Sequence, residues 1–192
     1  MRLVGWLWWG WGLYWMLSAL RNKATQRRES LPSRLAHLLP LALGGALIAW
    51  PQPPGSALGW RLWPPSLAAY WMGVALVITG LAFAVWARAH LGRNWSGTVT
   101  IKEDHELIRS GPYAYVRHPI YTGLLAALLG TTLASGTVHA AIGLAIIAAA
   151  LVRKSRVEES FMREIFPDTY PRYSAEVPAL IPFTRTTHSP AP

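Results

Sequence analysis

The residues best suited to chemistry in this chain are gathered in two polar segments, residues 91–118 and 153–182. The first segment closes with Arg117 and His118, and Tyr121 follows one turn later. The second opens with basic residues and then a pair of glutamates at positions 158 and 159. Guanidinium, imidazole, phenol and carboxylate groups brought together can bind a ligand that carries both signs of charge. Such a site requires elements that bring the two segments to one place.

The stretches around these segments are apolar and of the length needed to cross a membrane. The chain is 52% hydrophobic and only 14% charged, whereas a soluble domain carries about 25% charged residues. A transmembrane helix needs about 20 mainly apolar residues. Five stretches qualify or nearly qualify, and they cover residues 3–20, 35–50, 66–89, 119–135 and 137–152. We therefore predict an all-α, polytopic membrane protein with about five transmembrane helices.

The connection between the last two predicted helices explains how the polar segments can meet. These helices are joined by almost nothing, with the turn falling within residues 134–137, which predicts a tight antiparallel hairpin. The fourth helix then starts at the same face where the fifth ends. We expect His118 and Tyr121 to lie near Arg156, Glu158 and Glu159.

Small residues predict close helix contacts in this hairpin. The relevant side chains are Gly123, Ala127 and Gly130 on the fourth helix and Ala141, Ala145, Ala148 and Ala149 on the fifth. The first helix instead carries five tryptophans, at positions 6, 8, 9, 11 and 15. We interpret them mainly as contacts with lipid or with neighbouring helices, and a role in binding a ligand tail is the alternative.

The distribution of basic residues predicts the orientation in the membrane. Of the 18 Lys and Arg residues, only Arg2 and Arg61 fall on one side, and all nine acidic residues fall on the other. The positive-inside rule places the N-terminus outside and the C-terminus in the cytoplasm. Because the basic residues sit in short connectors between apolar helices, the net charge of +9 does not indicate a nucleic-acid partner. We expect an integral membrane protein of a bacterial inner membrane or the endoplasmic reticulum, with its active site at the cytoplasmic face.

Several classes of chemistry are excluded or disfavoured. The chain has no cysteine, which excludes disulfides and thiolate catalysis. No glycine-rich nucleotide-binding turn follows a strand. The six histidines lack the paired spacing of metal ligands, so no metal site is predicted. We divide the chain into three N-terminal helices (residues 1–90), a catalytic region with an amphipathic C-terminal helix (residues 91–183) and a tail (residues 184–192).

One motif points to a known family. The run from Arg117 to Gly123, Arg-His-Pro-Ile-Tyr-Thr-Gly, is followed after the hairpin by Glu158 and Glu159. Gly111-Pro112-Tyr113 precedes it, and aromatic and proline residues trail it up to Pro182. Over residues 92–183 the chain resembles the isoprenylcysteine carboxyl methyltransferase family. This resemblance implies a membrane enzyme that uses S-adenosylmethionine as methyl donor.

The resemblance also implies roles for individual residues. Glu158 matches a cofactor-contacting glutamate, and the basic residue that faces the acceptor carboxylate falls near Lys154, with Arg156 as the alternative. The stretches that match the family's cofactor enclosure contain His105, Glu106, Leu107, Ile108, Tyr113, His118, Pro119, Ile120 and Tyr121. On charge alone, Arg117 and His118 could hold the cofactor carboxylate and Glu158 its ammonium group.

The nature of the acceptor decides which other groups are needed. A carboxylate acceptor is already ionised and needs only a cation to orient it, which Lys154 or Arg156 could supply. An amine acceptor needs deprotonation, and Glu159 is then the candidate base. We expect a lipophilic acceptor, either a prenylated cysteine or a similar hydrophobic acid, reached from the surrounding membrane lipid.

Three other interpretations remain open at this point. A phospholipid amine N-methyltransferase carries a related motif. An NADPH-dependent sterol-type reductase also places an Arg-His-Pro-like motif before a terminal helix pair, although the double glutamate and the short chain argue against it. A non-enzymatic membrane subunit would explain the helices but gives no reason for the clustered polar residues.

Overall fold

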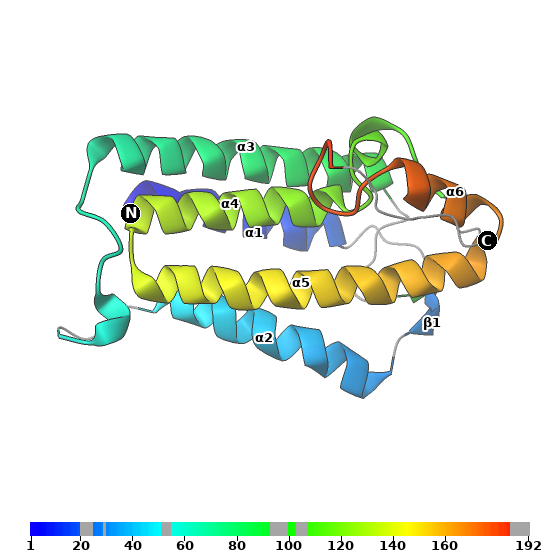
Figure 1. Cartoon of the computed structure of the whole chain (residues 1–192), viewed down its shortest axis with the longest axis horizontal. Helices are drawn as coiled ribbons and strands as arrows, with labels where there is room; N and C mark the ends of the chain where they lie inside the picture. Colours follow the sequence, from blue (N-terminus) through cyan, green and yellow to red (C-terminus); the bar gives the residue numbers. More distant parts are fainter. Residues whose placement is uncertain (20–24, 29, 51–54, 93–99, 103–106, 185–192) are drawn as a thin grey trace.

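A computed structural model describes residues 1–19, 25–28, 30–50, 55–92, 100–102 and 107–184. Within these ranges the chain forms six α-helices and one small sheet. The helices are α1 (Arg2–Ala19), α2 (Leu31–Ala49), α3 (Leu67–Leu91), α4 (Pro119–Ser135), α5 (Val138–Ile165) and α6 (Thr169–Glu176). The first five run side by side along the long axis of the molecule, and α6 lies at one end (Figure 1). The prediction of an all-α, polytopic architecture is confirmed.

Three helices are long and apolar enough to cross a membrane. They are α2, α3 and α5. Helix α4 is apolar but shorter, with 17 residues. Helix α1 has 18 residues, five of them tryptophans that suit a membrane interface. The confirmed part of the five-helix prediction is therefore a polytopic protein with three clear candidate spans, and α1 and α4 as further spans stay a prediction.

The closest helix contact joins α3 and α4. A Cβ atom added to Gly80 would lie 2.6 Å from the carbonyl oxygen of Gly123, and one added to Gly73 would lie 2.5 Å from that of Gly130. The two glycine pairs are both seven residues apart, so the antiparallel backbones touch at two successive levels. Our assignment of the small residues of α4 to the α4–α5 contact was wrong for Gly123 and Gly130. They face α3 because that helix carries matching glycines.

The tight turn between α4 and α5 is confirmed. Gly136 ends α4 with a φ of 63°, a left-handed conformation that favours glycine, and α5 begins two residues later. The main chain of the connector between α2 and α3 holds this turn, because the N–H of Leu62 donates to the carbonyl of Gly136. On its other side α5 meets α2, where Gly44 and Gly143 allow close approach.

Helix α5 is longer than the sequence pattern predicted. It continues without a break through Ile165, for 28 residues. At 1.5 Å per residue it is about 42 Å long, which exceeds the roughly 30 Å hydrocarbon core. The separate amphipathic helix expected after residue 152 is therefore the second half of α5, followed by the short helix α6. A single rigid helix thus carries both the apolar span and the double glutamate.

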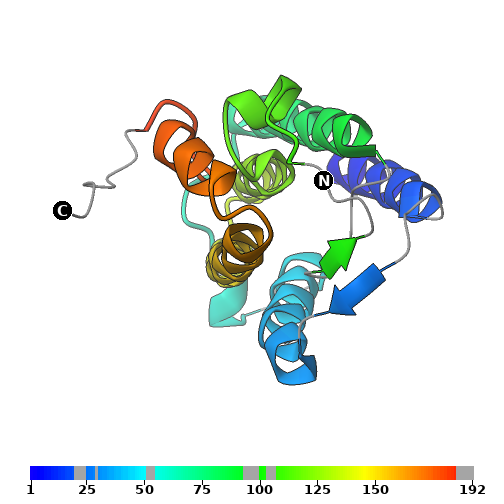
Figure 2. The same ribbon diagram turned by 90° about the vertical axis from the view of Figure 1, so that its right-hand side faces the viewer.

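A small sheet and helix α1 complete the fold. The strands β1 (Thr25–Arg28) and β2 (Thr100–Lys102) pair in antiparallel fashion at one end of the bundle, an element that the sequence did not predict (Figure 2). In α1, Trp6 and Trp9 are exposed, whereas the indole N–H of Trp8 donates to the hydroxyl of Thr131 at 3.0 Å. A helix contact thus accounts for Trp8, and lipid contacts of Trp6 and Trp9 stay a prediction.

Candidate active site

The candidate site lies where α4 begins, beside the second half of α5. His118 precedes α4 and Pro119 is its first residue, where a missing N–H costs nothing. The rings of His118 and Tyr121 are parallel, with centroids 5.5 Å apart. Gly111, with a φ of 59°, turns the chain toward this start, and a Cβ there would strike the ring of His90. The local sequence therefore presents the imidazole and the phenol to α5 as a stacked pair.

Glu158 is the first of two neighbouring carboxylates on α5 that contact this pair. It accepts a hydrogen bond from the Tyr121 hydroxyl at 2.5 Å. His118 Nδ1 lies 3.4 Å from its second oxygen. The Lys154 ammonium is 3.7 Å from the first oxygen and 5.3 Å from the centre of the Tyr121 ring. Glu158 thus sits among a lysine, a histidine and a tyrosine, and we call this group the Glu158 side of the site.

Glu159 points in a different direction along α5. Its Oε1 accepts hydrogen bonds from Arg117 Nε at 2.9 Å and from Arg117 Nη2 at 2.7 Å, and His118 Nε2 lies 3.1 Å away. Its other oxygen is 3.2 Å from the guanidinium of Arg163. Three basic groups therefore share one carboxylate, and we call this group the Glu159 side.

Arg117 links the Glu159 side to the segment around α6. Its remaining donors reach the carbonyl oxygens of Ser174 and Val177. The guanidinium is thereby directed into the protein. Four hydrogen bonds of Arg117 thus go to Glu159 and to the main chain, and its role in holding a cofactor carboxylate stays a prediction.

Because these side chains are buried, water only weakly screens the interactions between their charges. Lys154 and Glu159 are 8% and 7% exposed. Burial alone would lower the pKa of His118, but hydrogen bonds and charge interactions with Glu158 and Glu159 outweigh it and raise the pKa. The raised pKa favours the imidazolium form of His118, and the ring bridges the two glutamates.

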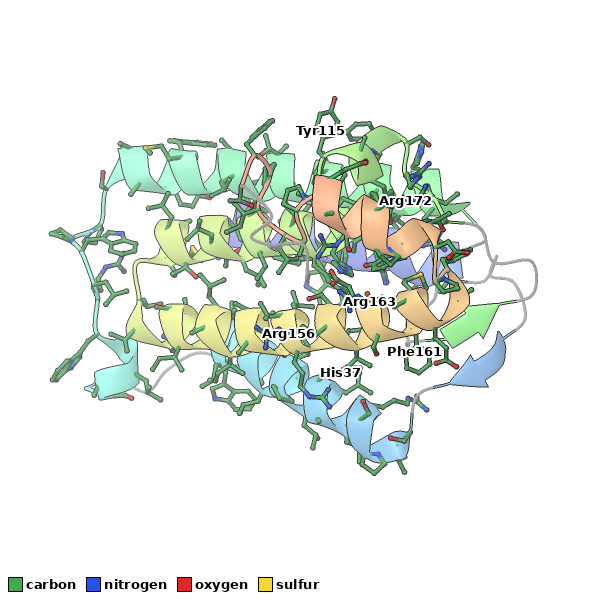
Figure 3. The ribbon with its side chains drawn as sticks, turned by 45° about the vertical axis from the view of Figure 1, so that its right-hand side comes forward. His37, Tyr115, Arg156, Phe161, Arg163 and Arg172 are labelled. Atoms are coloured by element: carbon green, nitrogen blue, oxygen red, sulfur yellow. The ribbon has the colours of Figure 1, made fainter. Side chains whose placement is uncertain are left out.

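The other predicted site residues differ in where the structure places them. Ile108, Tyr113, Ile120 and Tyr121 meet in one apolar cluster with Trp15 of α1, and Pro119 is buried beside them. Leu107 is half-buried at the start of this stretch. His105 and Glu106 lie outside the described residues. Arg156 is exposed (Figure 3), whereas Lys154 is buried and lies beside Tyr121 and Glu158, so a place for Arg156 in the site stays a prediction.

Sequence reasoning missed several residues that complete the site. Arg163 could have been found, because it stands four residues after Glu159 on the same helix. Tyr173 donates its hydroxyl to the carbonyl of Tyr113 at 2.7 Å, and burial raises the pKa of Tyr173 to about 12, so it remains a donor. That contact joins residues sixty positions apart, so no local sequence pattern indicates it.

Comparison with known proteins places the chain in a family. Residues 68–169, more than half of the chain, match the family described as phospholipid methyltransferase. The chain belongs to this family of membrane methyltransferases, which includes the isoprenylcysteine carboxyl methyltransferases. The matched region covers α3, α4, α5 and both glutamates, and leaves out α1 and α2.

Individual relatives agree with this assignment. The chain is 28% identical over 126 residues to protein-S-isoprenylcysteine O-methyltransferase B of Arabidopsis thaliana, with 62% of this chain and 64% of that protein covered. It is 32% identical over 99 residues to the protein-S-isoprenylcysteine O-methyltransferase of Schizosaccharomyces pombe, with 50% and 42% covered. The alignments therefore span only 42% to 64% of these relatives' length.

A solved structure has the same fold. It is the eukaryotic intramembrane Ras methyltransferase, an isoprenylcysteine carboxyl methyltransferase. The TM-score is 0.50 at 22% sequence identity, and the superposition covers 82% of this chain and 54% of that one. At this identity the likeness concerns the fold alone.

Proposed function

We propose that this protein transfers the methyl group of S-adenosylmethionine to the carboxylate of a lipophilic acceptor, either a prenylated cysteine or a similar hydrophobic acid. The observation that carries the proposal is the buried Lys154, which lies beside Tyr121 and Glu158 at the end of an apolar helix face. The residues that would hold the donor and those that would hold the acceptor can be assigned separately.

The Glu158 side fits the amino-acid part of S-adenosylmethionine. That part carries an ammonium and a carboxylate, and the site pairs the Glu158 carboxylate with the His118 imidazolium, 3.4 Å apart. Glu158 would hold the ammonium group and His118 the carboxylate, because each group then meets its opposite charge. When bound, S-adenosylmethionine supplies an electrophilic methyl group on its sulfonium. The half-buried Leu107 and Ile108 and the buried Tyr113 and Ile120 would enclose its apolar surface.

The carboxylates of the site argue against an acceptor that must lose a proton. Glu159 already accepts from Arg117, His118 and Arg163, so it is a poor base. Glu158 accepts from Tyr121 and faces Lys154. An acceptor that is itself a carboxylate needs no base, since it is ionised at neutral pH. This favours a carboxyl acceptor over a phospholipid amine, which remains the alternative that the family description suggests.

The position of Lys154 on α5 indicates a lipophilic acceptor. Ile147, Leu151, Lys154 and Glu158 follow one another on one face of the helix. Ile147 and Leu151 belong to an apolar cluster with Leu128 of α4. An acid with a long apolar tail could place its tail along this face and its carboxylate at Lys154. Lys154 is therefore our candidate for the acceptor-orienting cation, and Arg156 is not, because it is exposed.

Two rival functions from the sequence lose support. A sterol-type reductase and a non-enzymatic subunit would both need an explanation for membership in a methyltransferase family. The site charges match a zwitterionic cofactor such as S-adenosylmethionine. We also propose that the N-terminus lies outside and that the site faces the cytoplasm, in a bacterial inner membrane or the endoplasmic reticulum, because the basic residues concentrate at that end.

The deciding experiment compares two neighbouring basic residues. Protein in nanodiscs is given radiolabelled S-adenosylmethionine and either a farnesylcysteine analogue or phosphatidylethanolamine. We expect transfer to the carboxylate, with Lys154→Met reducing kcat/KM for the acceptor at least 100-fold and leaving cofactor binding in calorimetry intact. Arg156→Met, the matched control, should retain full activity. Transfer to the amine lipid alone would move the assignment to N-methylation, and no cofactor binding by the unmodified protein would overturn both.

A further inference from the structure

The last described segment, residues 177–184, turns back over the start of α4 after α6 ends (Figure 1). Three successive carbonyl groups hold it there. The N–H groups of Arg117 and His118 donate to Pro178 at 2.8 Å and to Ala179 at 3.0 Å. The Thr122 hydroxyl donates to the carbonyl of Leu180 at 2.6 Å. We call residues 177–184 the C-terminal segment, and its path beside the first turn of α4 is fixed by these bonds.

The contact between α3 and α4 shows how deep this segment lies. A Cβ on Gly123 would meet the backbone of Gly80 and Ala84, so Thr122 is level with about residue 83 of α3. The first basic residue of α3, Arg88, follows five residues later. At about 1.5 Å per residue, Leu180 therefore lies roughly 8 Å to the bilayer side of Arg88. This level belongs to the apolar part of a helix that is long enough to span the membrane.

The side chains that follow this level are large, apolar and exposed. Ile181 is 66% exposed and Phe183 is 92% exposed. Trp86 of α3 and Tyr115 are also exposed, and Tyr115 lies on the outer surface at this end of the molecule (Figure 3). Exposed aromatic residues at such a level are typical of a membrane interface. The C-terminal segment thus exposes apolar side chains at about the depth at which α3 exposes Trp86.

We propose that Ile181 and Phe183 insert into the bilayer beside the start of α4, so that the C-terminal segment binds the acyl chains of membrane phospholipids. Water would solvate these two side chains unfavourably, whereas hydrocarbon accommodates them. The same segment binds the main chain of Arg117 and His118, so the lipid contact also supports the start of α4. This inference concerns the attachment of the protein to lipid and is independent of the proposed reaction.

The absence of cysteine from the chain allows a clean test. A single cysteine is introduced by Phe183→Cys, or by Glu176→Cys at the exposed end of α6 as the matched control. Each variant is spin-labelled and placed, one protein per disc, in phosphatidylcholine nanodiscs. The collision rates with oxygen, which concentrates in hydrocarbon, and with a neutral water-soluble nickel chelate are then compared. Because Phe183 is 92% exposed, its replacement should remove little packing within the described structure.

The proposal predicts opposite results at the two positions. At position 183 oxygen should relax the label severalfold more strongly than the nickel chelate, and at position 176 the order should be reversed. Nickel-dominated relaxation at both positions would show that the segment lies in water and would overturn the proposal. Protection from both reagents at position 183 would also overturn it, because protein rather than lipid would then cover the side chain.

Discussion

The two sides of the candidate site differ although their central residues are neighbours in the chain. The Glu158 side is a carboxylate that contacts one lysine, one tyrosine and one ring nitrogen of the histidine. The Glu159 side is a carboxylate shared by three basic groups and connected through Arg117 to the carbonyls of Ser174 and Val177. Adjacent residues of a helix point about 100° apart. One glutamate can therefore serve the ligand while the next holds the structure together.

Removing the charge of Glu158 and removing that of Glu159 should therefore have different consequences. Loss of the negative charge at Glu159 would leave the Arg117 guanidinium and the His118 imidazolium buried with one counter-charge fewer. Loss of the charge at Glu158 would remove the ion pair with Lys154, but Glu158 is more exposed than Glu159, with 23% of its side chain accessible against 9%. Stability should therefore depend mainly on the Glu159 side, and ligand affinity mainly on the Glu158 side.

The largest effect is expected for Glu159→Gln. Removing one partner of a buried ion pair typically costs about 3–5 kcal/mol, because the remaining charge loses its compensation. We expect a lower melting temperature in detergent, followed by circular dichroism, and loss of the fold of residues 166–182. Glu158→Gln is the matched control and should lose less than half as much stability while it weakens S-adenosylmethionine binding. Equal melting temperatures for the two variants would contradict the division into two sides.

The outline of the fold and most of the site could be predicted from the sequence. The apolar stretches located α2, α3, α4 and the first half of α5, and the four-residue connection required the hairpin that brings His118 to the glutamates. The second half of α5 was missed, because its charged residues end the apolar pattern without ending the helix.

Contacts between residues far apart in the sequence could not be predicted in the same way. The glycines at positions 73, 80, 123 and 130 are visible in the sequence, but their spacing does not say which helix pairs with which. The direction of Arg117 depends on carbonyls about sixty residues later, and the β1–β2 pair joins two connectors of no marked pattern. Lys154 and Arg156 were equivalent by type, and only the rotation of α5 separates them.

The second effect is a dependence of stability on pH through His118. The folded-state pKa of this imidazole is raised above its unfolded value, so its contribution to stability is fully present below the unfolded pKa of about 6.5. That contribution is lost as the pH rises through the folded pKa. The glutamates of both sides face the ring, and they remain ionised over this range.

We therefore expect the melting temperature to fall as the pH is raised from about 6.5 through the folded pKa of His118. His118→Gln should be less stable at low pH and should lack this decline. A decline of the same size in His118→Gln would assign it to other groups. A His118→Gln profile that differs from that of the unmodified protein only at high pH would reverse the sign that we derive.

The smallest effect is expected for Arg163→Ala, which tests how the Glu159 side distributes its charge. Arg163 is half-exposed, with 44% of its side chain accessible, whereas Arg117 is almost buried. A partly exposed ion pair contributes about 0.2–1 kcal/mol, because water screens it and the long side chain loses freedom. Arg163→Ala should therefore lower the melting temperature slightly, more so at low salt than at high salt. Arg117→Ala, measured in parallel, should be far more damaging and nearly insensitive to salt. If the two arginines proved equally important, the Glu159 side would be a surface network, and the buried Arg117–Glu159 pair would not be what holds the start of α4 to α5.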